Sequence, residues 1–308
     1  MILWLIAVPL VAAELFSQGR EPLDLRSKPE LINASACTSC HAEEGAAWEQ
    51  SAHHRASTNK RYAVATPQPW CKNCHAPVTA SEGVNCATCH VRDNQVLTPH
   101  RVTTSAHTSR FEPSMTQSSF CSGCHDFHFP TQMQMPIADH VTDSSELLQS
   151  VFAEWTQTQS GTCQSCHVQG HRFITGRKKD TITVSAKQCD GETNVRLRVK
   201  GVGHAFPTGD PFRRAIVEVW NSDGKTSYEL GHQTRRHGER YTFANDTRIQ
   251  PCKSDVCEEL LTFTQPATHW RLRYLYANPH DEPRLTEAER EVVLAEGRVD
   301  PTCAAPAQ

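Results

Sequence analysis

Residues 71–90 read CKNCHAPVTASEGVNCATCH, a stretch that contains one five-residue pattern twice. The pattern is Cys-x-x-Cys-His, and it occurs three more times between residues 37 and 167. Its ten cysteines are Cys37, Cys40, Cys71, Cys74, Cys86, Cys89, Cys121, Cys124, Cys163 and Cys166. The histidines that complete the five patterns are His41, His75, His90, His125 and His167. One repeated pattern therefore accounts for most of the 14 cysteines in the chain.

This pattern is the attachment signature of c-type haem. Two thiols on one short turn add across the two vinyl groups of a macrocycle, and the His that follows lies under the iron as its proximal ligand. The sequence therefore predicts five covalently attached haem c groups. Each would be bound through one pair of cysteines and one proximal histidine.

Zinc is the competing interpretation, because Cys-x-x-Cys pairs also build zinc ribbons and knuckles. Zinc does not require His directly after the second Cys, and His makes up only 17 of 308 residues. Five such histidines by chance have a probability on the order of one in a million, which favours haem. Five pairs also cannot close into four-cysteine sites without one pair left over. A thioredoxin-like site is less consistent still, because it occurs once, in a βαβ context.

The composition agrees with a large apolar cofactor. Only 38% of the residues are hydrophobic, and adding the 15 glycines still leaves the fraction below the roughly 45–50% of globular chains. Five haem macrocycles would supply the missing core. The net charge of −3 argues against a nucleic-acid partner. Ionised propionates would move that charge to about −8 with ferric haems or about −13 with ferrous haems.

The first residues indicate export. Residues 2–13 are apolar, too few to span a bilayer, which needs about 20 residues. They fit the apolar region of a secretory signal peptide over residues 1–17, although no Lys or Arg precedes them. A buried N-terminal helix is the alternative. Covalent haem attachment is completed outside the cytoplasm, which agrees with a signal peptide and predicts a periplasmic or extracellular location in a bacterium.

The residue pattern predicts an α+β protein with two domains. Residues 30–178 would form a mainly helical and loop domain wrapped around stacked haems, with helices over residues 42–56 and 144–158. Residues 180–308 would form an antiparallel β-sandwich-like domain. Its predicted strands alternate apolar and polar residues at 181–187, 194–200, 215–220, 259–265 and 269–276. Turn signals occur at Asp190-Gly191 and at 222–224, and a capping box begins at Thr286.

Four cysteines lie outside the repeated pattern: Cys189, Cys252, Cys257 and Cys303. In an oxidising compartment we expect them to form disulfides. Cys252 and Cys257 could staple a hairpin, leaving Cys189 and Cys303 as a second pair or as free thiols. Three connectivities are open, and the sequence does not choose among them.

A low-spin electron-transfer haem needs a second strong axial ligand, His or Met, whereas an open position indicates catalysis. Subtracting the five proximal histidines from 17 leaves twelve. The candidate distal ligands are His53, His100, His107, His171 and His204. A surface position or a bond to a propionate is favoured for His54, His128 and His140, and Met133 and Met135 are further candidates. Ordinary roles are expected for His232, His237, His269 and His280.

The pattern Trp48-x-x-Ser-x-His53 and the stretch Glu82-Gly-Val-x-Cys86 resemble the multihaem cytochrome c family, which includes the tetrahaem electron acceptor of hydroxylamine oxidoreductase. The segment 203–209, Gly-His-Ala-Phe-Pro-Thr-Gly, is similar to a β-domain appended in many members. The resemblance implies a haem-stacked helical domain with His53 and His171 as distal ligands. His54 follows His53 where the family usually has Ala, so either of the two could bind iron.

Electron transfer between redox proteins is the predicted function. One alternative is a multihaem reductase or oxidase of a small nitrogen or sulfur compound, with one five-coordinate haem. The other is a docking or filament-forming subunit in which the β-domain dominates. The expected partners are a redox donor and acceptor, without nucleic acid and without a transmembrane span. Association with a membrane complex or with other cytochromes is compatible with this function.

Overall fold

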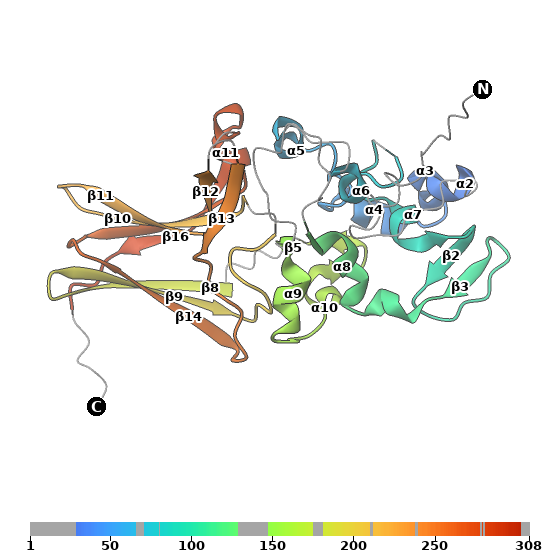
Figure 1. Cartoon of the computed structure of the whole chain (residues 1–308). Coiled ribbons are helices and arrows are strands. Elements are labelled where there is room, and N and C mark those ends of the chain that lie inside the picture. Colours follow the sequence, from blue (N-terminus) through green and yellow to red (C-terminus); the bar gives the residue numbers. More distant parts are fainter. Residues whose placement is uncertain are drawn as a thin grey trace, which may run out of the picture. The chain divides into compact units, whose positions relative to one another are not determined.

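The computed structural model describes residues 29–65, 71–79, 81–128, 147–174, 181–209, 212–237, 240–277, 279 and 281–302. The chain divides into two compact units (Figure 1). Unit 1 contains residues 1–132, 144–147 and 162–176, and unit 2 contains residues 133–143, 148–161 and 177–308. Helices and antiparallel sheets are both present, so the α+β class is confirmed. Several predictions concern positions outside the described residues: the signal peptide, Met133, Met135, His140, His280 and Cys303.

Unit 1 consists of short helices joined by turns and very short strands. Its helices are α2 (Pro29–Ile32), α3 (Ala34–Thr38), α4 (Ala42–Glu49), α5 (Lys60–Val64), α6 (Lys72–His75), α7 (Cys86–His90), η2 (Pro113–Thr116), α8 (Ser119–His125) and α10 (Cys163–His167). Its strands are β1 (Val91–Arg92), β2 (Gln95–Thr98), β3 (Ser109–Phe111), β4 (Asp126–His128), β6 (Val168–Gln169) and β7 (Arg172–Phe173). Strand β5 (Leu147–Ser150) begins at the last residue of a unit 1 segment.

Side-chain caps start two of the helices that carry the repeated pattern. The Asn85 side chain accepts a hydrogen bond from the Thr88 amide at the start of α7. Thr162 and Ser165 form a reciprocal capping box at the start of α10. Such caps satisfy amides that a first helical turn leaves unpaired, which matters most for helices this short.

Unit 2 contains two antiparallel sheets that share one hydrophobic core. One sheet has the order β14 (Val256–Phe263), β9 (Glu192–Lys200), β8 (Ile182–Cys189). The other has the order β11 (Lys225–Leu230), β10 (Arg214–Trp220), β15 (His269–Leu275), β16 (Glu291–Arg298). The strands of each sheet lie together as a layer in Figure 1. Leu197, Val217 and Leu272 are fully buried and belong to one cluster, which joins the inner faces of both sheets.

Strand alternation was a good guide in unit 2. All five predicted strands are present as β8, β9, β10, β14 and β15, with ends that differ by a few residues. Asp190 and Gly191 both have positive φ, 53° and 83°, as a two-residue turn between β8 and β9 requires. The capping box at Thr286 is also confirmed, at the start of α11 (Glu287–Arg290). The remaining elements of unit 2 are α9 (Val151–Thr156), η5 (Glu282–Arg284) and the two-stranded sheet of β12 (His232–His237) and β13 (Arg240–Asp246).

Two predicted helices are wrong in extent. The helix expected over residues 42–56 ends at Glu49, and residues 51–58 form turns. Backbone carbonyls in this segment accept hydrogen bonds from distant groups, His53 from the Val84 amide and Ala56 from the His75 ring. The helix expected over 144–158 is strand β5 followed by α9, so residues 147–150 are extended rather than helical.

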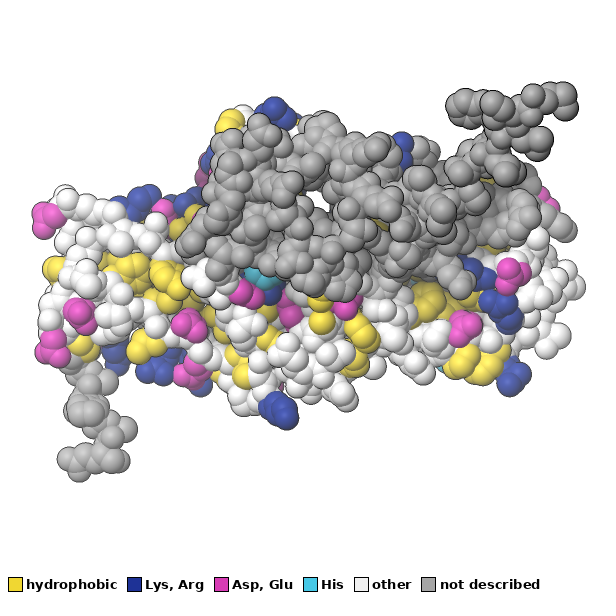
Figure 2. Space-filling view, in the orientation of Figure 1, with side chains coloured by type: hydrophobic (Ala, Val, Ile, Leu, Met, Phe, Trp, Pro, Cys, Tyr) yellow, Lys and Arg dark blue, Asp and Glu magenta, His cyan; other side chains and the backbone are white. Residues whose placement is uncertain are grey.

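Cys252 and Cys257 form a disulfide at the start of β14, with their Cα atoms 5.7 Å apart. Cys189 is also disulfide-bonded. The outer surface of unit 2 carries ion pairs beside exposed apolar side chains: on β9 and β14, Arg196 and Arg198 both contact Glu258, and Leu260 is 53% exposed. Figure 2 likewise shows acidic and basic side chains interspersed over the described part of the visible face. No helix within the described ranges has the length and apolar character needed to cross a bilayer.

Candidate functional site

Three of the five motif histidines have the same ring orientation. The Nδ1 atom of His75 lies 2.9 Å from the carbonyl oxygen of Ala56, that of His90 2.9 Å from Leu97, and that of His167 3.0 Å from Ile174. A carbonyl only accepts hydrogen bonds, so Nδ1 is the protonated atom and Nε2 carries the lone pair. This outer hydrogen bond is the usual support of a metal-bound imidazole, and it leaves Nε2 available for iron.

For the other two motif histidines, His125 and His41, nearby histidines show where each ring lies. Desolvation by the surrounding chain and the nearby His167 and His75 lower the pKa of His125, although the residue keeps an exposed surface. His41 lies close enough to His90 to contribute to a lowered pKa there, where burial is again the largest cause. Lowered pKa values favour neutral imidazole, which is the form that binds metal.

Two candidate distal histidines face motif histidines across a gap of the right size. The ring centroids of His90 and His171 are 5.9 Å apart, and those of His53 and His125 are 6.4 Å apart. Two imidazoles on opposite sides of one iron, each with an N–metal distance of about 2 Å, have centroids roughly 6 Å apart. The two pairs thus have the separation expected for axial ligands of one haem each.

The hairpin of β6 and β7 contributes a residue to one histidine pair and contacts the other. His171 lies in its turn, and Phe173 in β7 packs against the His53 ring with a centroid distance of 4.4 Å. The hairpin follows the fifth motif directly along the chain. One short element therefore positions residues for the third and fourth motifs.

The remaining candidates are placed elsewhere. His100 is exposed, and Nδ1 of His107 lies 3.1 Å from the Ser109 hydroxyl oxygen. Among the described ring contacts, neither faces a motif histidine. His204 belongs to unit 2, where its Nδ1 lies 3.0 Å from the carbonyl oxygen of Ala205. His54 packs on Trp48 with a centroid distance of 4.4 Å, and its Nδ1 lies 3.0 Å from the carbonyl oxygen of Glu49.

The five motifs form one connected group. The thiols of Cys37 and Cys86 are hydrogen-bonded, which joins the first motif to the third. The thiols of Cys121 and Cys163 join the fourth motif to the fifth. The pKa of Cys121 is raised by that hydrogen bond first, then by burial, and also by the charge of Cys89 in the third motif. His75 of the second motif lies near His125 of the fourth.

The protein interior around the motifs fits a large apolar group with a polar edge. Among the described residues of unit 1, the buried apolar side chains are few and mostly small, and the 17-residue hydrophobic cluster lies wholly in unit 2. The Tyr62 ring stacks on His75 with a centroid distance of 4.6 Å, and its buried hydroxyl has no hydrogen-bond partner among the described residues. Within the described ranges no group of three or more His, Cys, Asp or Glu is arranged to hold a metal ion. Haem iron needs only two protein ligands, because the macrocycle supplies the other four.

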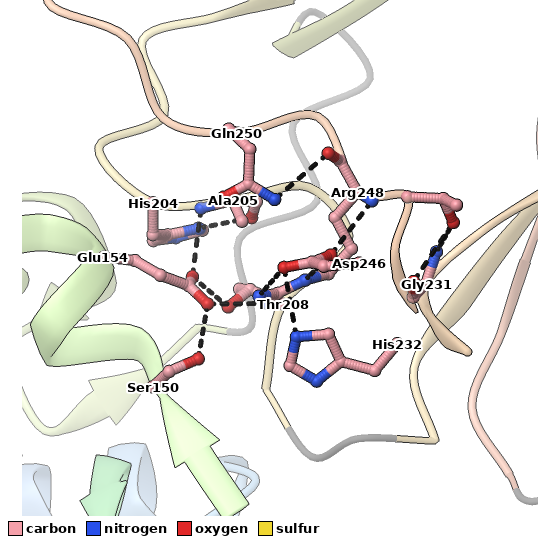
Figure 3. Close-up of polar contacts among 11 residues, drawn as sticks. Ser150, Glu154, His204, Ala205, Thr208, Gly231, His232, Asp246, Arg248 and Gln250 are labelled. Carbon is pink, nitrogen blue, oxygen red and sulfur yellow. Dashed lines mark hydrogen bonds and ion pairs between the residues drawn. The ribbon is translucent and has the colours of Figure 1, made fainter. Parts of the chain in front are cut away.

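Unit 2 contains a buried polar network that the sequence did not reveal (Figure 3). The Glu154 carboxylate of α9 accepts hydrogen bonds from Ser150 (2.6 Å), from the Ala205 amide (3.0 Å), from Thr208 (2.8 Å) and from Arg248 (2.6 Å). Arg248 also donates to Asp246, which contacts His232. The network ties α9 to the 203–209 loop and to the segment after β13. Nothing in the spacing of Glu154 marks it as buried.

Sequence reasoning also missed the carbonyl partners of the motif histidines. Any residue offers a backbone carbonyl, so the identities of Ala56, Leu97 and Ile174 did not predict that they accept hydrogen bonds from the motif histidines. The packing of Phe173 on the His53 ring was not predicted either.

No protein-family model matches the sequence, and no curated protein is similar to it. A solved structure has the same overall fold: the penta-haem cytochrome c552 from Thermochromatium tepidum, with a TM-score of 0.61. The two chains are 18% identical, and the match covers 88% of this chain and all of that one. Both units of the chain are therefore included for the most part in the shared fold.

Proposed function

We propose that this protein is a penta-haem c-type cytochrome that transfers electrons between redox partners. The observation that carries the proposal is the connected group of five Cys-x-x-Cys-His motifs, in which His75, His90 and His167 present Nε2 to a space short of apolar side chains. The shared fold with a penta-haem cytochrome supports it. Residues 30–178 would hold the haems, and residues 180–308 would form the β-sandwich-like domain.

Each motif would attach one haem through two thioether bonds, with each thiol hydrogen and sulfur adding across a vinyl group. His41, His75, His90, His125 and His167 would be the proximal ligands. His171 would be the distal ligand opposite His90, and His53 the distal ligand opposite His125. His100, His107 and His204 stay candidates for the other three irons.

Electron transfer follows from how the motifs are connected. The first motif adjoins the third, the third lies near the fourth, and the fourth lies near the second and adjoins the fifth. Haems attached at adjoining motifs lie near one another, which is the arrangement that lets electrons pass singly along a chain of centres. Two strong axial ligands per iron suit this role, because they leave no site for a substrate.

We place the protein outside the cytoplasm, in the periplasm or at the cell surface. Covalent haem attachment is completed there, and the disulfide between Cys252 and Cys257 is typical of an oxidising compartment. The apolar start of the chain agrees with export. The partners would be redox proteins, alone or within a membrane complex.

The first test is the haem content of the purified full-length protein. A pyridine haemochrome assay combined with intact mass should give five haems per chain. Replacing Cys163 and Cys166 together by Ala should lower that number by one. Replacing Cys252 and Cys257 by Ala is the matched control, because it removes two cysteines outside the motifs and should leave five haems. No covalent haem, or haem retained in full after loss of a motif, would contradict the proposal.

A second measurement separates the carrier from an enzyme. The ferric protein should show only low-spin signals in electron paramagnetic resonance, and the ferrous protein should not bind carbon monoxide. A high-spin haem that turns over nitrite or a sulfur compound would favour the reductase interpretation instead.

A further inference from the structure

His53 and His54 are adjacent, and both are imidazoles on the same turn, yet the structure gives them different surroundings. The His53 ring faces His125 at 6.4 Å and Phe173 at 4.4 Å. The His54 ring packs on Trp48 instead. Since side chains of neighbouring residues point in different directions, a rotation of the backbone here would move the His53 ring away from His125. Something must hold the backbone in one orientation.

The stretch Glu82-Gly83-Val84-Asn85, here named the 82–85 loop, contacts this backbone. The Val84 amide donates to the carbonyl oxygen of His53 at 2.9 Å. A Cβ atom built on Gly83 would lie 2.4 Å from the carbonyl oxygens of both His53 and His54. Gly83 also has a φ of +61°, a conformation that side chains disfavour. Only glycine lets the loop approach both carbonyls this closely.

Trp48 connects the same loop to the unused imidazole. Its indole N–H donates to the carbonyl oxygen of Val84 at 2.8 Å, and its ring packs on His54 with a centroid distance of 4.4 Å. The His54 amide donates to the buried Ser51 hydroxyl at 3.2 Å. These contacts hold His54 on Trp48 and direct it away from His125.

The loop itself is anchored at both ends, so it cannot move aside cheaply. The Asn85 side chain caps α7 and donates to the carbonyl oxygen of Ile32 at 2.9 Å and to Glu82 at 2.7 Å. Glu82 also accepts from the amide of Ala34 and from the hydroxyl of Thr79. Asn85 is only 2% exposed, so its hydrogen bonds are shielded from water. A group larger than hydrogen at Gly83 must therefore displace the 53–54 backbone rather than the loop.

We infer that Gly83 is a positioning residue that selects His53 over His54 as the axial ligand opposite His125. The inference rests on the proposed function, because it concerns a ligand to haem iron. It also links two motifs mechanically: the 82–85 loop caps the helix of the third motif and sets the distal ligand of the fourth.

The test is Gly83→Ala in the full-length holoprotein. Haem attachment depends on the cysteines, so five haems should remain. About one haem in five should lose its distal histidine, which gives a high-spin ferric signal and carbon monoxide binding by that fraction. Added imidazole should restore the low-spin signal. His53→Ala is the positive reference and should give the same spectra, whereas His54→Ala should match the wild type.

Gly191→Ala is the matched control. Gly191 also has positive φ, +83°, but a Cβ atom there would meet nothing within 4 Å. It imposes a similar backbone penalty without displacing a histidine, and its spectra should equal those of the wild type. A loss of ligation in Gly191→Ala as well would overturn the inference, because the effect would then be general destabilisation.

Trp48→Phe provides a milder variant should Gly83→Ala fail to fold. It removes the hydrogen bond to Val84 but keeps a ring beside His54. Carbon monoxide should therefore bind to one of the five haems in a minority of the molecules, above the wild-type level. Wild-type spectra in every folded variant of Gly83 and Trp48, or loss of the ligand in His54→Ala rather than His53→Ala, would overturn the inference. A wild-type protein without covalent haem would refute the proposed function itself, so the two failures are distinguishable.

Discussion

At the scale of single residues, hydrogen-bond partners decide what each ionisable group does. Three motif histidines, His75, His90 and His167, donate from Nδ1 to backbone carbonyls, which leaves the Nε2 lone pair available. In unit 2 the same logic applies to an acid. Burial alone would raise the pKa of Asp246, but hydrogen bonds from Arg248 and His232 outweigh burial and hold it well below the ordinary value of 3.8.

Asp246 therefore makes stability depend on acidity. A carboxyl whose pKa is lowered by folding stabilises the native state above its unfolded pKa, and that contribution is lost as the pH falls further. We expect Asp246→Asn to be less stable than the wild type at neutral pH and the difference to shrink below about pH 4. Urea unfolding followed by circular dichroism at several pH values measures it. A constant difference across the acid range would show that Asp246 does not titrate as described.

At the scale of elements, a helix ends where its carbonyls are needed elsewhere. Helix α4 ends at Glu49, whose carbonyl oxygen faces the His54 ring and the Arg55 guanidinium instead of a backbone amide one turn later. The periodicity of residues 42–56 does not contain that information. In unit 2 the alternation of residues did predict strands, because strands such as β9 have one buried and one solvated face.

The contact between α9 and the 203–209 loop depends on Glu154, whose side chain is 5% exposed and faces four donors. In Glu154→Gln the side-chain NH2 group would face one of these four donors, and the buried Arg248 would lose its carboxylate acceptor. We expect a loss of about 3 kcal/mol in the free energy of unfolding. Arg196→Ala, which breaks an exposed ion pair with Glu258, is the control and should cost less than about 1 kcal/mol. Equal effects in the two variants would refute a special role for Glu154.

At the scale of the whole molecule, charge is the property that partners sense first. The polypeptide is close to neutral, at −3 among 308 residues, and acidic and basic side chains are interspersed over the described part of the visible face (Figure 2). Haem propionates would therefore dominate the field of the holoprotein, at about −8 in the ferric state. Such a protein should attract cationic partners.

Salt dependence tests this balance. The rate at which a cationic complex such as hexaammineruthenium exchanges electrons with the protein should fall as ionic strength rises. The rate with an anionic complex such as ferricyanide should rise over the same range. Stopped-flow absorbance in the Soret band follows both reactions. Opposite signs for the two salt effects would mean that local basic residues, not the propionates, control the encounter.

The sequence by itself determined the attachment chemistry and the class of fold. Five residues suffice for each motif, and alternation over a few residues suffices for each strand of unit 2, so both are local properties. The tertiary structure decided which histidine faces which. The His53 ring lies 6.4 Å from that of His125 and the His171 ring 5.9 Å from that of His90, across long sequence separations, and Gly83 lies against the 53–54 backbone. A distal ligand is chosen by proximity between segments far apart in the chain, and residue type alone does not contain that distance.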